Sequence, residues 1–528
     1  MDSVETLKEL ADYSHIGHVF FHCIKKKPND ICQIDAATGQ EETNSSVLSR
    51  TIRLAQAMRK FGLKPGDVLA FGGNNHLDLH IPYYAGLMNG YPIVGVDPLY
   101  KLDELRSLFK ITQPKIAFCP RSNQDLYRKA AMDLGLDLKV VTYEDGEESM
   151  KQFLELYNDH EPESQFKLAE FDTEKIYIFL VTTSGTSNTV KVAAFKHKDV
   201  LKKFISFLTM MVHPRNRPTI GLNLSPVQWI SGIFNAICMP MTDQTKLQTS
   251  NPDDVDHLID VINKYKPHTA LISPTLMLTL MKRKHEIDFS CFKSIIVSGA
   301  KVNYDVLYEM KEYLKKTTVV METYGMTETL GPIFAPNITG PKGSCGSSMP
   351  SYDVKLVDPV TGVEITEPYV PGELLAKGYG FTEYLQNPEE TKNALTEDGY
   401  IKTGDLLYRD EEYNFYFVER IKMMIKYRNA QIVPLELEDV IQSHPGVLHA
   451  CVVGIPHAED CEHPAACVVR KPGSTVTAQD IKELVASKLS KSKELRGGVV
   501  FVDKLPMTST GKIAVGKVKK YLHNAIRE

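Results

Sequence analysis

The chain has 528 residues, of which 43% are hydrophobic and 24% charged, and its formal net charge is −5. One hydrophobic core rarely grows beyond about 300 residues, so this length predicts more than one structural part. The ordinary composition excludes disordered and collagen-like classes, and the mixed charge, with no long basic stripe, argues against a nucleic-acid partner.

Short apolar runs bounded by turn residues alternate with helical patterns along the first three quarters of the chain. Such alternation predicts a mainly parallel sheet with helices on its faces. A helix is expected at 81–88, and another after Asn303, whose apolar stripe comprises Val306, Leu307, Met310 and Leu314. The predicted strands are 67–71, 91–96, 115–119, 138–142, 270–272, 294–297 and 317–323.

The pattern changes from about Ser351, where short strands separated by turns predict a β-rich section. After Arg420 a compact tail has its own helix, at 435–443, and strand, at 450–453. We therefore predict an α/β protein with an N-terminal domain at 1–419 and a small C-terminal domain at 420–528.

The ends of the chain and its cysteines give expectations about location. The N-terminus lacks the features of a secretory signal, and no apolar run approaches the roughly 18 residues that span a membrane. The last residues, Ala525–Glu528, are not a Ser-Lys-Leu peroxisomal signal. Nine unpatterned cysteines indicate reduced thiols, and the spacing of Cys461, His463 and Cys467 fits no common zinc site. We expect a cytoplasmic protein, with the peroxisome as alternative.

The segment Thr182–Lys191 follows a buried-strand pattern and is rich in Ser and Thr. Hydroxyls and backbone N–H groups around Gly185 suit phosphate oxygens, and Lys191 adds a cation. The flanking residues Val190 and Val192 exclude a Walker loop, which needs Gly before its lysine and Ser or Thr after it. A polar surface loop is the alternative interpretation.

Three further segments carry candidate chemistry. After the strand at 317–323, Tyr324 offers a flat face for a purine, and Glu328 offers a hard oxygen ligand for magnesium. Asp405, in a tight turn, suits the two hydroxyls of a ribose. Lys512 lies in a hydroxyl-rich segment near the C-terminus, where a lysine can stabilise developing negative charge. Each has a plain alternative as a solvated turn or surface residue.

In this order along the chain, the four segments resemble the adenylate-forming (AMP-binding) superfamily, in particular its branch of acyl-CoA ligases, 4-coumarate-CoA ligases and firefly luciferase. The resemblance implies a large N-terminal domain of packed mixed sheets and helices with a β-rich section, and a small mobile α/β C-terminal domain. It implies a set of nucleotide-binding residues: Thr183, Ser184, Gly185, Thr186 and Lys191 for the phosphates, Gly299, Ala300, Tyr324 and Gly325 for the adenine, and Asp405 and Arg420 for the ribose.

The resemblance also implies catalytic roles. Thr327 corresponds to a phosphate contact, Glu328 to the magnesium ligand, Lys512 to the lysine of adenylation, Lys426 to a lysine that faces the thioester-forming site, and Lys422 to the hinge. The implied activity is an acid–thiol ligase: ATP activates a carboxylic acid, which we expect to be a medium- or long-chain fatty acid, and coenzyme A then accepts the acyl group. The cofactors would be ATP, Mg²⁺ and coenzyme A, without a nucleic-acid or membrane-spanning partner.

The chain departs from the family pattern at several positions. Ser187-Asn188 stands where the family usually has Thr-Gly, valines flank Lys191, and Asn429 replaces a glycine. Luciferases carry a His-His pair where this chain has Gln228-Trp229; we predict that Gln228, Trp229 and Gly232 line the acyl pocket. The alternatives are therefore a weakly active or non-catalytic acyl- or nucleotide-binding relative, and a luciferase-like monooxygenase.

Overall fold

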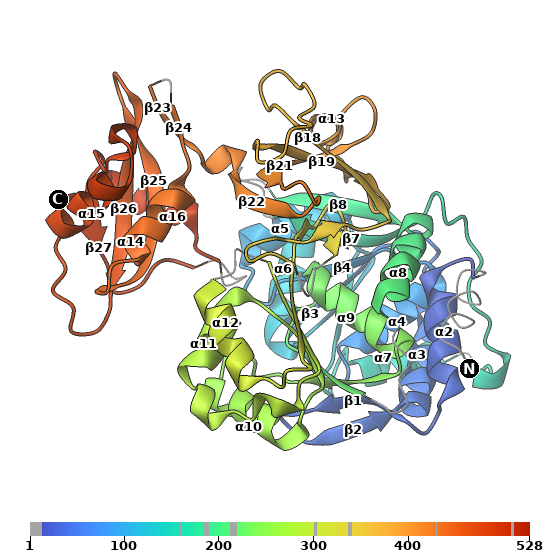
Figure 1. Ribbon diagram of the computed structural model, residues 1–528. Helices are drawn as coiled ribbons and strands as arrows, with labels where there is room; N and C mark the ends of the chain where they lie inside the picture. Colours follow the sequence, from blue (N-terminus) through green and yellow to red (C-terminus); the bar gives the residue numbers. More distant parts are fainter. Residues whose placement is uncertain are drawn as a thin grey trace. The chain divides into compact units, whose positions relative to one another are not determined.

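The computed structural model describes residues 13–158, 160–183, 190–211, 219–299, 304–335, 340–428, 430–507 and 512–528. The chain divides into two compact units (Figure 1). The first comprises Met1–Thr339, Ser348–Asp353 and Lys377–Ile401, and the second comprises Gly340–Ser347, Val354–Ala376 and Lys402–Glu528. The boundary at 419/420 stays a prediction. No helix among the described residues is long and apolar enough to cross a membrane.

One large sheet of the first unit has seven strands, and its central pairs are parallel as predicted. In spatial order they are β13 (Val319–Thr323), β12 (Ser294–Ser298), β11 (Thr269–Ile272), β9 (Thr219–Asn223), β10 (Gln244–Gln248), β1 (Ile31–Asp35) and β2 (Gln40–Thr43). Apolar residues of these strands form one core with three helices: α10 (Val255–Tyr265), α11 (Pro274–Lys282) and α12 (Tyr304–Tyr313). Asn303, the predicted cap of α12, lies outside the described residues.

The second large sheet also has seven strands, and here the edge is antiparallel. The order is β20 (Phe381–Tyr384), β8 (Lys191–Lys196), β7 (Tyr177–Thr183), β4 (Ile93–Val96), β3 (Leu69–Gly72), β5 (Ile116–Cys119) and β6 (Lys139–Thr142). The strands predicted at 67–71, 91–96, 115–119 and 138–142 are thereby confirmed, with their bounds shifted by one or two residues.

Alternating side chains of this second sheet enter two different cores, because successive residues of a strand point to opposite faces. Ala70 and Val94 pack with α5 (Leu102–Thr112) and α6 (Gln124–Asp133), whereas Leu69, Phe71 and Ile93 face the largest core. That core takes side chains from α2 (Ile16–Lys26), α3 (Asn44–Phe61), α4 (His80–Asn89), α7 (Met150–Leu156), α8 (His197–Met211) and α9 (Ile230–Met241). The helix predicted at 81–88 is α4.

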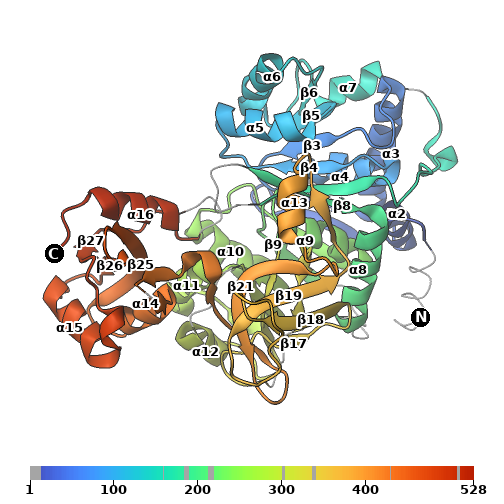
Figure 2. The same ribbon diagram turned by 90° about the horizontal axis from the view of Figure 1, so that it is seen from above.

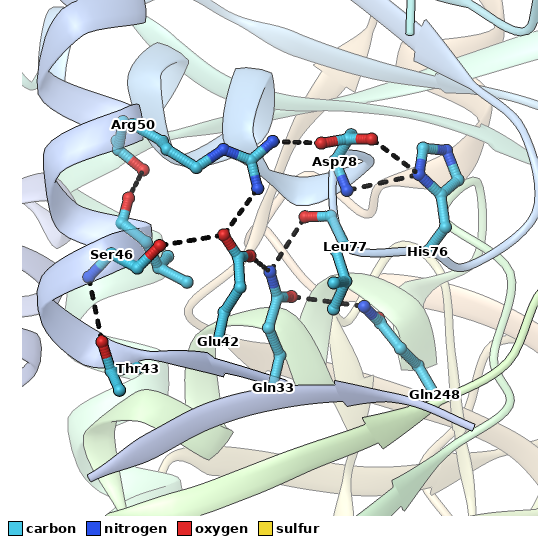
Figure 3. Close-up of polar contacts among 11 residues, drawn as sticks. Gln33, Glu42, Thr43, Ser46, Arg50, His76, Leu77, Asp78 and Gln248 are labelled. Atoms are coloured by element: carbon cyan, nitrogen blue, oxygen red, sulfur yellow. Dashed lines mark hydrogen bonds and ion pairs between the residues drawn. The ribbon is translucent and has the colours of Figure 1, made fainter. Parts of the chain in front are cut away.

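A polar network ties the first sheet to α3 and to the segment before α4 (Figure 3). The Glu42 carboxylate accepts hydrogen bonds from Ser46 at 3.0 Å and Arg50 at 2.8 Å, and Arg50 also pairs with Asp78. Gln33 donates to Glu42 at 2.6 Å and to the carbonyl oxygen of Leu77 at 2.9 Å. Because these partners come from separate elements, their pairing fixes the register of β1 and β2 against the helical layer.

The predicted β-rich section is confirmed. Its four-stranded sheet is made of β18 (Tyr352–Val357), β19 (Gly372–Gly378), β21 (Ile401–Arg409) and β22 (Phe415–Arg420). Five shorter elements lie nearby in the chain. Four precede β18, namely β14 (Gly325–Met326), β15 (Gly331–Pro332), β16 (Phe334–Ala335) and β17 (Ser347–Ser348), and α13 (Pro388–Ala394) precedes β21.

The C-terminal part of the second unit is a five-stranded sheet covered on both faces (Figure 2). Val452 packs with α14 (Pro434–Gln442) and α15 (Ala478–Lys488), and Val453 packs with α16 (Val515–Asn524). The strands are β23 (Ile425–Tyr427), β24 (Ala430–Ile432), β25 (Val447–His457), β26 (Cys461–Arg470) and β27 (Val499–Phe501). The helix predicted at 435–443 and the strand predicted at 450–453 are confirmed.

Candidate active site

Gly299 and Tyr324 lie at the carboxyl ends of two neighbouring parallel strands. Ser298 of β12 is the register partner of Thr323 of β13, and its hydroxyl donates to the Thr323 carbonyl at 3.2 Å. Ligands of open α/β sheets bind outside the carboxyl ends of the strands, so this edge is the expected place for an adenine. Gly299 has φ +103°, a left-handed conformation that favours glycine. Ala300 lies outside the described residues.

A tight hairpin of β14 and β15 presents Thr327 and Glu328. A Cβ at Gly325 would lie 2.1 Å from the carbonyl oxygen of Gly331, so glycine is required here by the chain's own fold. The resemblance assigns the same glycine to the adenine contact, which stays a prediction. Thr329 closes the turn, since its hydroxyl accepts from the Met326 N–H at 3.1 Å.

Glu328 is buried, with 6% of its surface exposed, and its Oε1 accepts a hydrogen bond from the hydroxyl of Tyr384 at 2.6 Å. Tyr384 is the last residue of β20, and its ring centroid lies 5.1 Å from the Nζ of Lys191. Lys191 also forms an ion pair with Glu390. Tyr384 therefore brings the predicted phosphate lysine and the predicted magnesium ligand together around one phenol.

Nothing in the sequence pointed to Tyr384. A tyrosine at the end of a short strand has no chemical signature of its own, and its partners lie far away along the chain. The segment Phe381–Tyr384 has no strict apolar alternation, and its aromatic and β-branched residues at most favour a short strand. Its role becomes visible because β20 pairs with β8, where Tyr384 is opposite Ala193, two residues from Lys191.

The candidate phosphate loop closes an antiparallel hairpin. Thr183, the last residue of β7, is the register partner of Lys191, the first residue of β8. Both ends of the loop are thus held side by side by the second sheet, and the Lys191 side chain keeps 11% of its surface exposed. Ser184, Gly185 and Thr186 lie outside the described residues.

The candidate acyl-pocket residues lie where the chain enters α9. Gln228 is buried, and Trp229, half-buried, is the N-cap residue of α9. A Cβ at Gly232 would lie 2.2 Å from the carbonyl oxygen of Pro226. A Cβ at Gly95, on β4, would lie 2.6 Å from the Cα of Gln228. The loop therefore fits only because positions 95 and 232 are glycines. The sequence analysis did not identify Gly95.

The second unit carries the predicted ribose residues. Asp405 of β21 and Arg420 of β22 are register partners, and the Nε of Arg420 donates to Oδ1 of Asp405 at 2.9 Å. Asp405 is 3% exposed, and its N–H donates to the hydroxyl of Thr403 at 3.2 Å. Gly404, with φ +70°, takes the left-handed conformation of this turn. The carboxylate is thus held rigidly beside a cation.

Three predicted lysines also belong to the second unit. The Lys512 side chain is exposed as a whole, but its ammonium group is partly desolvated, and this desolvation lowers its pKa. The positive charge of Arg420 lowers the pKa of Lys512 further, whereas the negative charge of Asp405 raises it. Lys422 lies in a short 3₁₀ turn, Ile421–Met423. Lys426 lies on β23, exposed, and its N–H donates to Oε2 of Glu462 at 3.1 Å. Asn429 lies outside the described residues.

Glu328 fits the magnesium ion that the resemblance implies. Its carboxylate offers hard oxygen atoms of the kind that Mg²⁺ prefers, and the Tyr384 hydroxyl fixes the orientation of one of them. Thr327 adds a hydroxyl from the same turn.

Two twisted α/β sheets with candidate nucleotide contacts at their strand ends, and a smaller β/α part, define an enzyme of the adenylate-forming class. The chain belongs to the AMP-binding enzyme family: the family model matches residues 20–384, and the model of the AMP-binding enzyme C-terminal domain matches residues 436–512. The predicted family and fold class are confirmed.

Relatives of several activities resemble the chain over nearly its whole length. A luciferin 4-monooxygenase from Photuris pensylvanica is 29% identical, covering 92% of this chain and 90% of the relative. The 4-coumarate–CoA ligase-like 9 protein of Arabidopsis thaliana is 27% identical, covering 91% and 85%. Among solved structures, ATP-bound MatB from Rhodopseudomonas palustris has a TM-score of 0.85 at 23% identity, covering 96% of this chain and 99% of that one. That likeness shows the fold.

Proposed function

We propose that this protein is an AMP-forming acid–CoA ligase that couples a carboxylic acid, of the medium- or long-chain fatty class, to coenzyme A. The observation that carries the proposal is the buried Glu328, oriented by Tyr384 beside Lys191. The second unit adds the Asp405–Arg420 pair, whose charges act on Lys512. A protein that only binds nucleotide or acid has no need for this combination of carboxylate and lysines.

In the proposed first step, an oxygen of the acid attacks the α-phosphorus of ATP, and the bond to pyrophosphate breaks. The chain contributes positioning and charge, because phosphoryl and nucleotidyl transfer need little covalent help from side chains. Asp405 would orient the ribose, while Lys191 and Lys512 would neutralise developing negative charge. Magnesium, when bound by Glu328 and Thr327, would supply further charge neutralisation on the phosphates.

In the proposed second step, the sulfur of coenzyme A attacks the acyl carbon of the adenylate, and AMP leaves. Lys426 is the candidate group for this step. Half-buried Trp229, at the start of α9, offers apolar surface for an acyl chain and supports the choice of a fatty substrate.

A panel of carboxylic acids tests the proposal. Pyrophosphate release should depend on the added acid, be greatest for a medium- or long-chain fatty acid, and yield acyl-CoA when coenzyme A is present. Absence of acid-dependent release across the panel would show that the protein is not a ligase of this kind.

Two lysine variants separate the steps. Lys512→Ala should lower acid-dependent pyrophosphate release by at least about 100-fold, a usual loss for a group that stabilises transition-state charge. Lys426→Ala should keep that release and slow acyl-CoA formation. The exposed Lys520→Ala is the matched control and should change neither rate. Equal losses of both activities in Lys512→Ala and Lys426→Ala would contradict the division of roles.

The similarity to luciferin 4-monooxygenases favours a second candidate, light-emitting oxidation of an adenylate. Gln228-Trp229 in place of a His-His pair weighs against it. Mixing the protein with firefly luciferin, ATP, Mg²⁺ and oxygen tests this candidate, and we expect no light above a protein-free blank.

A further inference from the structure

The tip of the β25–β26 hairpin gathers side chains that the proposed reaction does not use. In the register of this hairpin, Ile455 faces His463 and His457 faces Cys461. Residues opposite each other, and residues two positions further along one strand, share a face of an antiparallel pair. His457 and His463 therefore lie diagonally on the same face, and Asp460 lies in the turn that joins their strands.

Three potential ligand atoms converge at this tip. One atom each from His457, Asp460 and His463 lie within 4.8 Å of one another. Oδ2 of Asp460 is 2.7 Å from Nε2 of His463 and 3.7 Å from Nδ1 of His457. In a tetrahedral zinc site, ligand atoms about 2.0–2.1 Å from the metal lie about 3.3 Å apart, so binding would draw the wider-spaced atoms together and open the 2.7 Å contact between Asp460 and His463.

The two imidazole rings lie face to face at this tip, and one of them is open to solvent. They stack with centroids 3.9 Å apart and an interplanar angle of 19°. His457 is the more exposed, at 39% of its side chain, and gives an ion access from solvent.

Arg428 holds Asp460 in place through two hydrogen bonds. The Nε of Arg428 donates to its Oδ1 at 2.5 Å, and the N–H of Arg428 donates to its carbonyl oxygen at 2.9 Å. The other oxygen, Oδ2, is thereby directed at the histidines. Such outer partners orient the ligands of many metal sites.

We propose that His457, Asp460 and His463 form a binding site for a divalent transition-metal ion of the zinc class. Two imidazole nitrogens and one carboxylate oxygen suit Zn²⁺, Co²⁺, Ni²⁺ or Cu²⁺, whereas Mg²⁺ prefers oxygen ligands alone. Three protein ligands leave at least one position for water or another small ligand. The site differs from the combination of Cys461, His463 and Cys467 considered on sequence: Cys467 is buried in the core of the sheet.

The test is a titration of the chelator-treated, full-length protein with ZnCl₂ in the presence of a chromogenic zinc indicator. The wild type should withdraw one equivalent of Zn²⁺ from the indicator, also in millimolar MgCl₂, and Co²⁺ should give the visible absorption of a low-coordinate site. His457→Gln, Asp460→Asn and His463→Gln should each lose this equivalent or weaken its binding at least tenfold. Circular dichroism and Tm in chelator establish that each variant is folded; His457, at the exposed edge, is the variant least able to disturb folding.

Two control variants sharpen the result. His523→Gln removes an exposed histidine of α16 and should bind Zn²⁺ as the wild type does. Cys461→Ser removes the exposed thiol next to the site and should also keep the equivalent. Unchanged zinc binding in all three ligand variants, loss of binding in Cys461→Ser alone, or weak binding without saturation would each overturn the proposed ligand set. None of these outcomes depends on ligase activity.

Discussion

Tyr384 shows how one side chain can organise charges contributed by distant segments. Its hydroxyl donates to Glu328, and its ring lies beside the ammonium group of Lys191, which is paired with Glu390. The hydrogen bond occupies one carboxylate oxygen and fixes the plane of the group. The ammonium group of Lys191 meanwhile has its own carboxylate partner, Glu390.

Tyr384→Phe should therefore lower the rate of acid-dependent pyrophosphate release about tenfold, the equivalent of about 1.4 kcal/mol and typical of a lost hydrogen bond to a charged group. The control is Tyr400→Phe, which removes a phenol hydroxyl paired with Asp353 at the surface. An unchanged rate in Tyr384→Phe would mean that Glu328 needs no such orientation.

The lowered pKa of Lys512 gives a prediction about pH. If adenylation needs the protonated ammonium, pyrophosphate release should fall on the alkaline side with a midpoint below the usual lysine value of about 10.5. Lys512→Arg should be slower but should lose this alkaline fall, because a guanidinium stays charged. Rate profiles of both proteins from pH 6 to 10 check this, and identical profiles would contradict it.

Candidate site residues were named from the sequence by their chemistry or by a family motif. Glu328, Asp405 and Lys512 were singled out for the chemistry of their side chains, and Arg420 from the resemblance; their roles stay predictions. Tyr384 was not named, since its contacts depend on the pairing of β20 with β8. Gly325 was named only for the adenine, whereas the structure shows that the carbonyl of Gly331 leaves no room for a side chain there.

At the scale of elements, the loop that enters α9 depends on two glycines, whose lack of a side chain leaves room for its backbone. Gly95 and Gly232 leave the space that the backbone from Pro226 to Gln228 occupies. The loop is thus placed by the sheet behind it and by the helix after it, and Val227, which is buried in the largest core, adds an apolar anchor of its own.

Gly232→Ala should displace this loop, because the new Cβ would lie 2.2 Å from a backbone oxygen. We expect a loss of roughly 1–3 kcal/mol in the free energy of unfolding, as for other overpacked sites, together with a changed preference for acid chain length. Gly516→Ala is the control: a Cβ there has open space, within α16, and should leave stability unchanged or slightly raised. Denaturant unfolding and the acid panel measure both effects, and equal stabilities would contradict the steric argument.

Two of the elements that the sequence analysis did not predict, β2 and α3, lack a clear apolar period. β2, Gln-Glu-Glu-Thr, has no apolar residue at all and pairs at the edge of its sheet. Helix α3 buries Thr51 and Gln56, whose amide nitrogen donates to the Glu161 carbonyl at 3.1 Å. Polar residues on a buried helical face interrupt the 3.6-residue apolar period on which the prediction of a helix depends.

At the scale of the whole molecule, α8 buries a lysine that affects stability. Lys203 is 0% exposed, and its Nζ donates to the carbonyl of Pro332 at 2.7 Å and lies 4.0 Å from the ring centroid of Tyr352. Burial lowers its pKa to about 7. Between pH 7 and the usual lysine pKa, the unfolded chain therefore binds more protons than the folded one, and this residue makes stability rise with pH.

Lys203→Met should flatten this rise by up to about 1.4 kcal/mol per pH unit, the value for one proton. Its exposed neighbour Lys202→Met should keep the wild-type slope. Unfolding by urea at pH 7, 8 and 9 gives the three slopes; a wild-type slope in Lys203→Met would show that the lysine is not protonated differently in the two states.

The sequence did not predict which residues belong to each of the two units. The chain length indicated more than one part, and the family match indicated a separate C-terminal domain. Residues 340–347 and 354–376 nevertheless join the second unit, because β18 and β19 form one sheet with β21 and β22. Strand partners so far apart along the chain leave no local period for a sequence prediction to use.

The loop between Pro226 and Gln228 has a practical consequence for engineering. Gln228 is buried against Gly95, whereas Trp229 is half-buried, so exchange of the side chain at 229 carries the smaller steric risk to folding. A library restricted to codon 229 should thus contain a larger share of folded members than one that also varies codon 228. Screening it against branched, aromatic and dicarboxylic acids offers a direct route to altered substrate choice.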